Sequence, residues 1–428
     1  MYEFPVEMFL AGADLTPITE NIDKIIAALT EWEPERKETG VITPAKVTAE
    51  GKDYQEAVHN MDMLFLREMW GDGLPIIPAT EEWVDWILTG TDLPRDEVIG
   101  QVNPRAGLAS VEAIAVALAM AGGRPEYLPV LIAAVKAITT PKWGLERMQA
   151  TTASIFPAVI VNGPAAQEMR LSASYGCLGP DPLRPAGGPI GRALRLILQD
   201  MGGAVPGIGT MAIYGGMRYT NAVFAEDEEG LPSGWKSLAE DRGFARGSNV
   251  VTVTPAGSVN NERLVKSDTP EKYALENLYL MATFMGTPHN NMYAGTWDAD
   301  PDFPSGVVMM GRGFAEAVAG EGWSKEEVKT FLWENSKVAW SELVRTGLTT
   351  VAMKCAGTSE GEPVPLTVNP EQLVVVVTGG IQSGHNYWMQ VGSGQYRQQS
   401  AEIELPANWD ELLKQAEEDL GPPPAAGE

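Results

Sequence analysis

The sequence predicts an α/β fold, in which a mixed or largely parallel sheet is flanked by helices, with a helical N-terminal region. Two observations lead to this prediction. Short, uniformly apolar runs end in glycine or polar loops, and segments with helical periodicity alternate with them. Strands that are apolar throughout are usually covered on both faces, and helices that cover a sheet in this way are typical of the α/β class.

The N-terminal region is predicted to be helical. Residues 1–51 contain one short helix, near Ile18–Trp32, and we expect them to form an arm that packs on the main body or on another subunit. Between Asp53 and Trp70, apolar residues recur every three or four positions, which is a helical period. This second helix should end at the glycines that follow it.

Two further helices should form a buried hairpin. Ser110 can cap a helix over Val111–Ala121, and Pro125 fits the first turn of a helix that continues to Ile138. Both segments are apolar nearly all round, so we expect them to lie in the core.

Strands and helices alternate in the rest of the chain. The predicted strands are Ile155–Val161, Val250–Thr254, Val307–Met310 and Leu373–Val377. The predicted helices are Ile190–Met201, Glu271–Met285, Phe314–Ala319, Ser324–Val338 and Trp409–Leu420. After the N-terminal arm we therefore expect a helical and α/β N-terminal domain over residues 52–245 and an α/β C-terminal domain over residues 246–428.

The net charge argues against two classes of partner. The 428 residues include 31 Lys and Arg against 57 Asp and Glu, a formal net charge of -26. A surface this acidic repels phosphate groups, so we expect neither nucleic acid nor membrane as a partner. The expected partners are a small-molecule substrate and further copies of the chain in a homo-oligomer.

Cysteine and histidine are scarce. The 2 cysteines, Cys177 and Cys355, exclude a disulfide framework and a Cys-rich zinc site, and they fit a reducing compartment. The N-terminus shows no basic segment that leads into an apolar run, so we expect no secretory signal and a cytoplasmic protein. A divalent metal would need mostly oxygen ligands; it is compatible with the sequence but not indicated by it.

The first candidate site is a loop after the last predicted strand. Open α/β sheets form their ligand crevice beyond the carboxyl ends of the strands. The glycine-rich segment Thr378–Trp388 occupies such a position and contains Gly379, Gly380, Ser383 and His385. Glycines let backbone N–H groups approach a ligand, and a histidine exchanges protons near neutral pH. A plain turn with a hydrogen-bonded histidine is the alternative.

Other loops offer single candidates. His289 lies in Thr287–Asn291 and could transfer protons or bind a metal, or belong to an Asn-rich turn. Asp72, between two glycines, offers a carboxylate for catalysis or for capping. Asn162 follows a predicted strand and is expected to help position a substrate. The acidic run Glu226–Glu229 is most simply a solvated loop.

A glycine-rich segment before a helix is a candidate anion site. Arg192 and Arg195 share one flank of the helix that Pro185–Ile190 leads into. Free N–H groups, the helix dipole and guanidinium groups all favour a carboxylate or phosphate, although ion pairs with the many carboxylates of the chain are an equal alternative. Cys177, a little upstream, is a candidate nucleophile if its pKa is lowered, and otherwise a small buried thiol.

No nucleotide cofactor is indicated. The segment before Arg192 does not match Gly-x-x-x-x-Gly-Lys-Ser/Thr, and Gly311-Arg312-Gly313 is followed by Glu316 where the dinucleotide fingerprint has glycine. The identity of any cofactor therefore stays open.

Several segments together carry a family resemblance. They are Gly71–Pro78, Gly107–Glu112, Pro125–Val130, Val161–Pro164, Ile190–Leu196 and Phe224–Glu226. As a set they resemble the UGSC-like family of poorly characterised bacterial proteins, over roughly Gly71–Phe244 and more weakly over Val374–His385. The Cys/selenocysteine-Gly-Ser-Cys motif that names the family is absent, so no thiol redox role carries over from it, and the resemblance implies no particular reaction.

The candidate residues predict an enzyme that acts on a small polar or anionic organic molecule by general acid–base chemistry, as a lyase, hydratase or hydrolase. The expected roles are proton transfer or metal ligation for His385 and His289, binding of an anionic group for Arg192 and Arg195, and substrate positioning for Asn162 and Asp72. Two alternatives stay open. One is a thiol enzyme that uses Cys177 for redox or covalent chemistry, and the other is a non-catalytic subunit or small-molecule binding protein.

Overall fold

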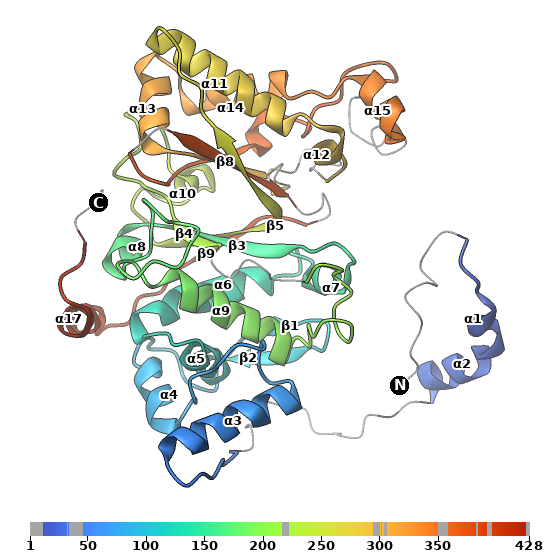
Figure 1. Ribbon diagram of the computed structural model, residues 1–428, viewed down its shortest axis with the longest axis vertical. Coiled ribbons are helices and arrows are strands. Elements are labelled where there is room, and N and C mark those ends of the chain that lie inside the picture. The colour runs from blue at the N-terminus through green and yellow to red at the C-terminus, as the bar shows by residue number, and fades with distance from the viewer. Residues whose placement is uncertain are drawn as a thin grey trace. The chain divides into compact units, whose positions relative to one another are not determined.

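Figure 1 shows the computed structural model of the chain. It describes residues 12–31, 33, 46–215, 222–293, 300, 302–303, 306–349, 358–381, 384–391 and 396–424. The chain divides into two compact units, Met1–Lys46 and Val47–Glu428. Ser383 and Cys355 lie outside the described residues.

The first unit contains two short helices, α1 (Thr16–Glu20) and α2 (Ile22–Thr30). The expected helix near Ile18–Trp32 is therefore confirmed, with a break at Asn21. Neither helix has a buried residue. The role of this segment as a packing arm stays a prediction.

The second unit begins with helices and a small hairpin of strands. Its first elements are α3 (Tyr54–Glu68), α4 (Glu81–Leu88), β1 (Val98–Val102), β2 (Gly107–Ser110), α5 (Val111–Met120), η2 (Pro125–Tyr127), α6 (Leu128–Ile138) and α7 (Leu145–Ala150). The Ser110 hydroxyl accepts a hydrogen bond from the Ala113 amide at 3.2 Å and so caps α5. Of the 10 residues of α5, 7 are buried, and of the 11 residues of α6, 10 are buried, which confirms that both helices lie in the core.

The main sheet contains seven of the strands in the described residues. They are β3 (Phe156–Asn162), β4 (Val223–Ala225), β5 (Val250–Arg263), β6 (Gly306–Met310), β7 (Val374–Val377), β8 (His385–Val391) and β9 (Gln399–Glu402). Their order is β4-β3-β5-β8-β6-β7, and β9 also pairs with β5. The sheet therefore joins strands from both sides of residue 245.

The sheet is mixed, which is one of the two forms that the sequence predicted. Only β3 with β4 and β6 with β7 pair in parallel, whereas β3–β5, β5–β8, β5–β9 and β6–β8 are antiparallel. The other form, a largely parallel sheet, is wrong. The apolar runs indicated burial on both faces, and a mixed sheet that is covered on both faces produces the same pattern.

Helices cover the two faces of the sheet. The remaining helices are α8 (Pro164–Glu168), α9 (Gly187–Leu196), the π-helical turn η3 (Ile197–Met201), α10 (Leu238–Asp241), α11 (Pro270–Met285), α12 (Pro288–Tyr293), α13 (Arg312–Gly320), α14 (Lys325–Asn335), α15 (Trp340–Thr346), η4 (Pro370–Gln372) and α17 (Trp409–Leu420). Figure 1 shows α5, α6 and α9 on one side of the sheet and α11, α13 and α14 on the other. No helix in the described ranges has both the length and the apolar composition needed to cross a bilayer.

Alternation along the strands separates two cores. In β6, Val307 and Met309 pack in the core shared with α5, α6 and α9, while Val308 and Met310 pack in the core shared with α11, α13 and α14. Strand β7 divides in the same way, because successive side chains of a strand point to opposite faces.

The sheet curls, so that the carboxyl ends of its edge strands β4 and β7 meet. The Asp227 amide, just after β4, donates to the Val377 carbonyl at 2.8 Å. Thr378 Oγ1, just after β7, lies 3.0 Å from the carbonyl oxygens of both Ala173 and Ala225. This junction brings the loop that contains Ala173 next to the ends of β6 and β7.

Candidate functional site

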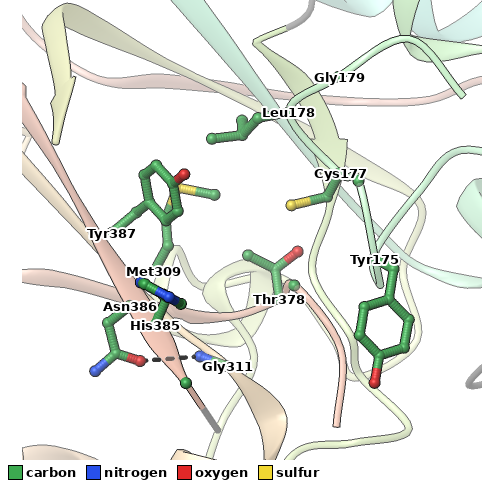
Figure 2. A pocket seen from close by; sticks show the side chains of 13 residues that line it. Tyr175, Cys177, Leu178, Gly179, Met309, Gly311, Thr378, His385, Asn386 and Tyr387 are labelled. Carbon is green, nitrogen blue, oxygen red and sulfur yellow. Dashed lines mark hydrogen bonds between the residues drawn. The ribbon is translucent and has the colours of Figure 1, made fainter. Parts of the chain in front are cut away.

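A cavity of about 510 Å³ lies at the carboxyl ends of β6 and β7 and the start of β8. The loop between α8 and α9 forms one wall, and the three strands and their loops form the other (Figure 2). The lining residues are Tyr175, Gly176, Cys177, Leu178, Gly179, Met309, Gly311, Thr378, Gly379, Gly384, His385, Asn386 and Tyr387. Of the predicted site residues, the cavity brings together Cys177, Gly379 and His385.

Local hydrogen bonds shape the loop that presents Cys177. The Cys177 amide donates to the Ser174 carbonyl at 3.3 Å, and the Gly179 amide donates to the Gly176 carbonyl at 2.8 Å. Gly176 has a φ of 73°, a left-handed conformation that favours glycine. Figure 2 shows the sulfur directed from this loop into the cavity, toward the wall that carries His385 and Tyr387.

Opposing effects act on the Cys177 thiol. Burial raises its pKa, whereas the Thr378 hydroxyl and the backbone amides of Cys177 and Leu178 lower it. Burial prevails, so the thiol is neutral at pH 7. Once a base removes the proton, the Leu178 amide can stabilise the thiolate, and the Thr378 hydroxyl can do so by turning its one hydrogen away from the carbonyls of Ala173 and Ala225.

The opposite wall is built by β8, which corrects a prediction. The glycine-rich loop was expected to run to Trp388, but His385 is the first residue of a strand that lies between β5 and β6. Pairing on both sides decides this conformation, not local propensity. The alternation of β8 directs His385 and Tyr387 toward the cavity, while Trp388 belongs to the core on the far face.

Asn386 and the glycine pair Gly379 and Gly380 shape the rim of the cavity. The Asn386 Oδ1 atom accepts a hydrogen bond from the Gly311 amide at 3.2 Å, which ties β8 to the start of α13 (Figure 2). Gly379 and Gly380 have φ values of 94° and 95°. A Cβ atom on Gly380 would lie 3.2 Å from the Tyr175 ring, so the close approach of these two segments requires glycine there.

Asp72 and Arg192 bind each other, away from this cavity. Arg192 Nε and Nη2 donate to the two Asp72 carboxyl oxygens, each at 2.9 Å. Nη2 also donates to the carbonyls of Leu74 at 3.1 Å and Pro75 at 2.9 Å. Burial opposes ionisation of Asp72, but the hydrogen bonds and charge of Arg192 outweigh it and lower the pKa of the carboxyl below its usual value.

Arg195 also lies outside the cavity lining, near the same aspartate. Its Nη1 atom donates to the Ala204 carbonyl at 3.3 Å. Burial lowers its pKa, and the charges of Asp72 and Asp200 act in the opposite direction. Asp200 keeps an exposed surface, yet the surrounding protein desolvates its carboxyl and raises its pKa to about 7, against the charge of Arg195.

Asn162 bridges two carboxylates of the run Glu226–Glu229, and this corrects the prediction that the run is a solvated loop. Its Nδ2 atom donates to Glu226 Oε2 and Glu228 Oε1, both at 2.7 Å. Glu226 is 4% exposed and also accepts the Leu238 amide, so the acidic run is not simply a solvated loop. Burial raises the pKa of Glu226, and the charge of Lys325 opposes that effect. Asn162 is thus engaged in the junction between β3 and β4.

His289 is an exposed residue of α12 and does not line the cavity. The described residues contain no group of three or more His, Cys, Asp or Glu that could hold a metal ion. Thr378 and Tyr387 line the cavity but were not among the predicted site residues, although both lie in the candidate segment Thr378–Trp388. Thr378 could have been found as the first polar residue after a predicted strand, but Tyr387 depends on a strand that was not predicted.

Comparison with protein-family models, with curated proteins and with solved structures found no significant match, so any function must be argued from the residues of this chain.

Proposed function

We propose that this protein is an enzyme that acts on a small polar organic molecule in the cavity of Cys177 and His385. One observation carries the proposal: a thiol and an imidazole line the same cavity from facing walls. Its volume of about 510 Å³ falls within the usual range for small-molecule sites. The hydroxyl groups of Thr378 and Tyr387 add further polar atoms to a lining that also contains apolar residues.

Because the Cys177 thiol is neutral, a base must remove its proton before the sulfur can attack a substrate. His385 accepts the Cys177 proton on its unprotonated ring nitrogen, and the sulfur electron pair forms a bond to an electrophilic carbonyl carbon of the substrate. The carbonyl π electrons move to oxygen and return as the leaving group departs with the proton from the imidazolium. Water then releases the acyl group from sulfur, or a second substrate accepts it. The reaction class is hydrolysis or group transfer with a covalent intermediate.

A second candidate function is general acid–base chemistry by His385 without a covalent step, as in a lyase or hydratase. The raised pKa of Cys177 favours it, because a neutral thiol is a poor nucleophile. Turnover of p-nitrophenyl acetate separates the two. The covalent route predicts a nitrophenolate burst that is lost in both Cys177→Ala and His385→Ala. The second candidate predicts no burst, and any slow release of nitrophenolate should be the same in Cys177→Ala as in the parent.

The primary test is the pH dependence of Cys177 alkylation by iodoacetamide. A Cys355→Ser background leaves Cys177 as the only thiol of the chain. If His385 takes the proton, His385→Ala should lower the rate of Cys177 alkylation at pH 7 about tenfold. The pH at which the alkylation rate rises should then be about one unit higher. His289→Ala is the matched control, because His289 is exposed and outside the cavity.

The outcomes are distinct. A shift in His385→Ala with none in His289→Ala supports the proposal. Coincident profiles for His385→Ala and its parent, or a Cys177 that does not react at any pH, overturn the covalent route and leave acid–base chemistry by His385 or a non-catalytic binding protein.

A further inference from the structure

We infer that Arg263 recognises a carboxylate group on the molecule that enters this cavity; the inference rests on the proposed function. In the antiparallel pair of β5 and β8, Arg263 is directly opposite His385. Residues in such a position project from the same face of the sheet, with Cβ atoms about 4.5–5.5 Å apart. Arg263 is not itself a lining residue, but its side chain starts beside that of His385, which is one.

The charge of Arg263 is not used elsewhere in the described structure. The Arg263 side chain is exposed, and within the described ranges it forms neither a hydrogen bond nor an ion pair. Other arginines are engaged by carboxylates, for example Arg242 by Asp302 at 2.6 Å and Arg397 by Asp300 at 2.9 Å. Arg246 is likewise exposed and has no carboxylate partner among the described residues, but only Arg263 lies opposite a residue that lines the cavity, which makes it the better place for an external anion.

The described residues that line the cavity bring no acidic side chain to oppose an anion. None of them is Asp or Glu, although the chain has 57 of these residues. The residue next to Arg263 on the same face of β5 is Asn261, opposite Tyr387, and it is uncharged. The edge of the cavity thus combines one guanidinium with neutral polar groups.

This arrangement favours a carboxylate. The planar guanidinium matches two carboxylate oxygens with parallel hydrogen bonds. No Lys or Arg is found among the described lining residues, so the single cation at Arg263 suits a monoanionic group better than a phosphate with more charge. The substrate class is therefore a small carboxylic acid whose electrophilic carbon reaches the Cys177 sulfur while its carboxylate lies at Arg263.

Two alkylating reagents of nearly equal size test the inference. Iodoacetate is anionic and iodoacetamide is neutral; with either, the thiolate sulfur forms a bond to the methylene carbon and iodide leaves. The measured quantity is the ratio of their rate constants at Cys177 in the Cys355→Ser background, divided by the same ratio for N-acetylcysteine. Intact-mass spectrometry follows both reactions at low ionic strength, where charge effects are least screened.

We expect Arg263→Gln to lower this ratio about tenfold, as the loss of a hydrogen-bonded ion contact predicts, with little change for iodoacetamide. Arg263→Lys should retain part of the preference. Arg246→Gln removes an exposed charge outside the cavity and should leave the ratio unchanged.

The results separate this inference from the proposed function. A normal iodoacetamide profile with equal ratios in Arg263→Gln and Arg246→Gln overturns the role of Arg263 alone. A ratio that falls equally in both variants points to net charge and also overturns it. Failure of Cys177 to react with iodoacetamide instead overturns the covalent route of the proposed function.

Discussion

Arg192 binds Asp72 through two parallel hydrogen bonds of 2.9 Å, although the residues are 120 positions apart in the chain. Both side chains are largely buried, at 18% and 7% exposure. The same guanidinium also binds the carbonyls of Leu74 and Pro75. These hydrogen bonds connect helix α9 to the turn at residues 71–75. They leave few N–H groups of Arg192 to bind a ligand.

Arg192→Met should therefore act on stability. Loss of one partner leaves the other charge buried and unpaired, which costs about 3 kcal/mol or more in the free energy of unfolding. The lowered folded-state pKa of Asp72 adds a pH dependence: the stabilisation is complete above the unfolded-state pKa and disappears as the pH falls through the folded-state pKa. Urea denaturation at several pH values measures both effects.

Arg95→Met is the matched control for Arg192→Met. Arg95 pairs with Asp85 and Glu112 at the surface, so its loss should cost less than about 1 kcal/mol. If Arg192→Met instead keeps full stability and lowers the iodoacetate preference of Cys177, the anion site expected from the sequence would stand and this structural role would not.

The sequence predicts the elements that depend on local pattern. Strands β3, β6 and β7 are continuous apolar runs, and α5 and α6 have clear caps and apolar surfaces, so burial and boundaries could both be read. Strand β8 could not, because His385–Val391 mixes polar and apolar residues. Its conformation comes from pairing with β5 and β6, which are distant in sequence.

The residues of the candidate site could be predicted in part from local sequence, but their arrangement in space could not. Cys177 and His385 could be named from their loops, but only the fold places them at one cavity. For Arg192 the sequence left an anion site and an ion pair with a carboxylate of the chain as alternatives. The structure shows the ion pair, with Asp72 as a partner that the sequence did not identify. Arg263 was not a predicted site residue, because its position opposite His385 follows from the register of a strand pair that was not predicted.

Glu262→Gln should stabilise the protein at neutral and alkaline pH. Glu262 is 2% exposed, and neither carboxyl oxygen has a partner in good hydrogen-bond geometry. Burial raises its pKa to about 8, and the Asn386 amide offsets this only in part. Between the ordinary carboxyl pKa and about 8 the folded state holds a proton that the unfolded state has lost, so stability falls as the pH rises.

The decline should be at most about 1.4 kcal/mol per pH unit in this window, and Glu262→Gln should remove it. Chemical denaturation between pH 5 and pH 8 measures it, with the exposed Glu321→Gln as control. A pH dependence that is the same in Glu262→Gln and its parent would mean that Glu262 titrates normally in the folded protein.

Thr378→Val should raise the pKa of Cys177 further. The hydroxyl lowers that pKa, and valine preserves the shape of the side chain without the donor. Iodoacetamide alkylation in the Cys355→Ser background should be slower at a fixed pH below the thiol pKa, by several-fold to about tenfold. Thr378→Ser keeps the donor and should restore the rate; an equal loss in both variants would assign the effect to packing.

Gly379→Ala and Gly380→Ala form a pair that separates backbone strain from a steric clash. Both residues have φ values near 95°, where an L side chain costs about 1–2 kcal/mol, so both variants should be destabilised by a similar amount. Only Gly380 has the Tyr175 ring at 3.2 Å from the added Cβ, whereas nothing lies within 4 Å at Gly379. Gly380→Ala should therefore also displace the loop that carries Cys177 and change its alkylation rate. Equal alkylation rates in the two variants would show that the contact between Gly380 and Tyr175 does not hold the cavity wall in place.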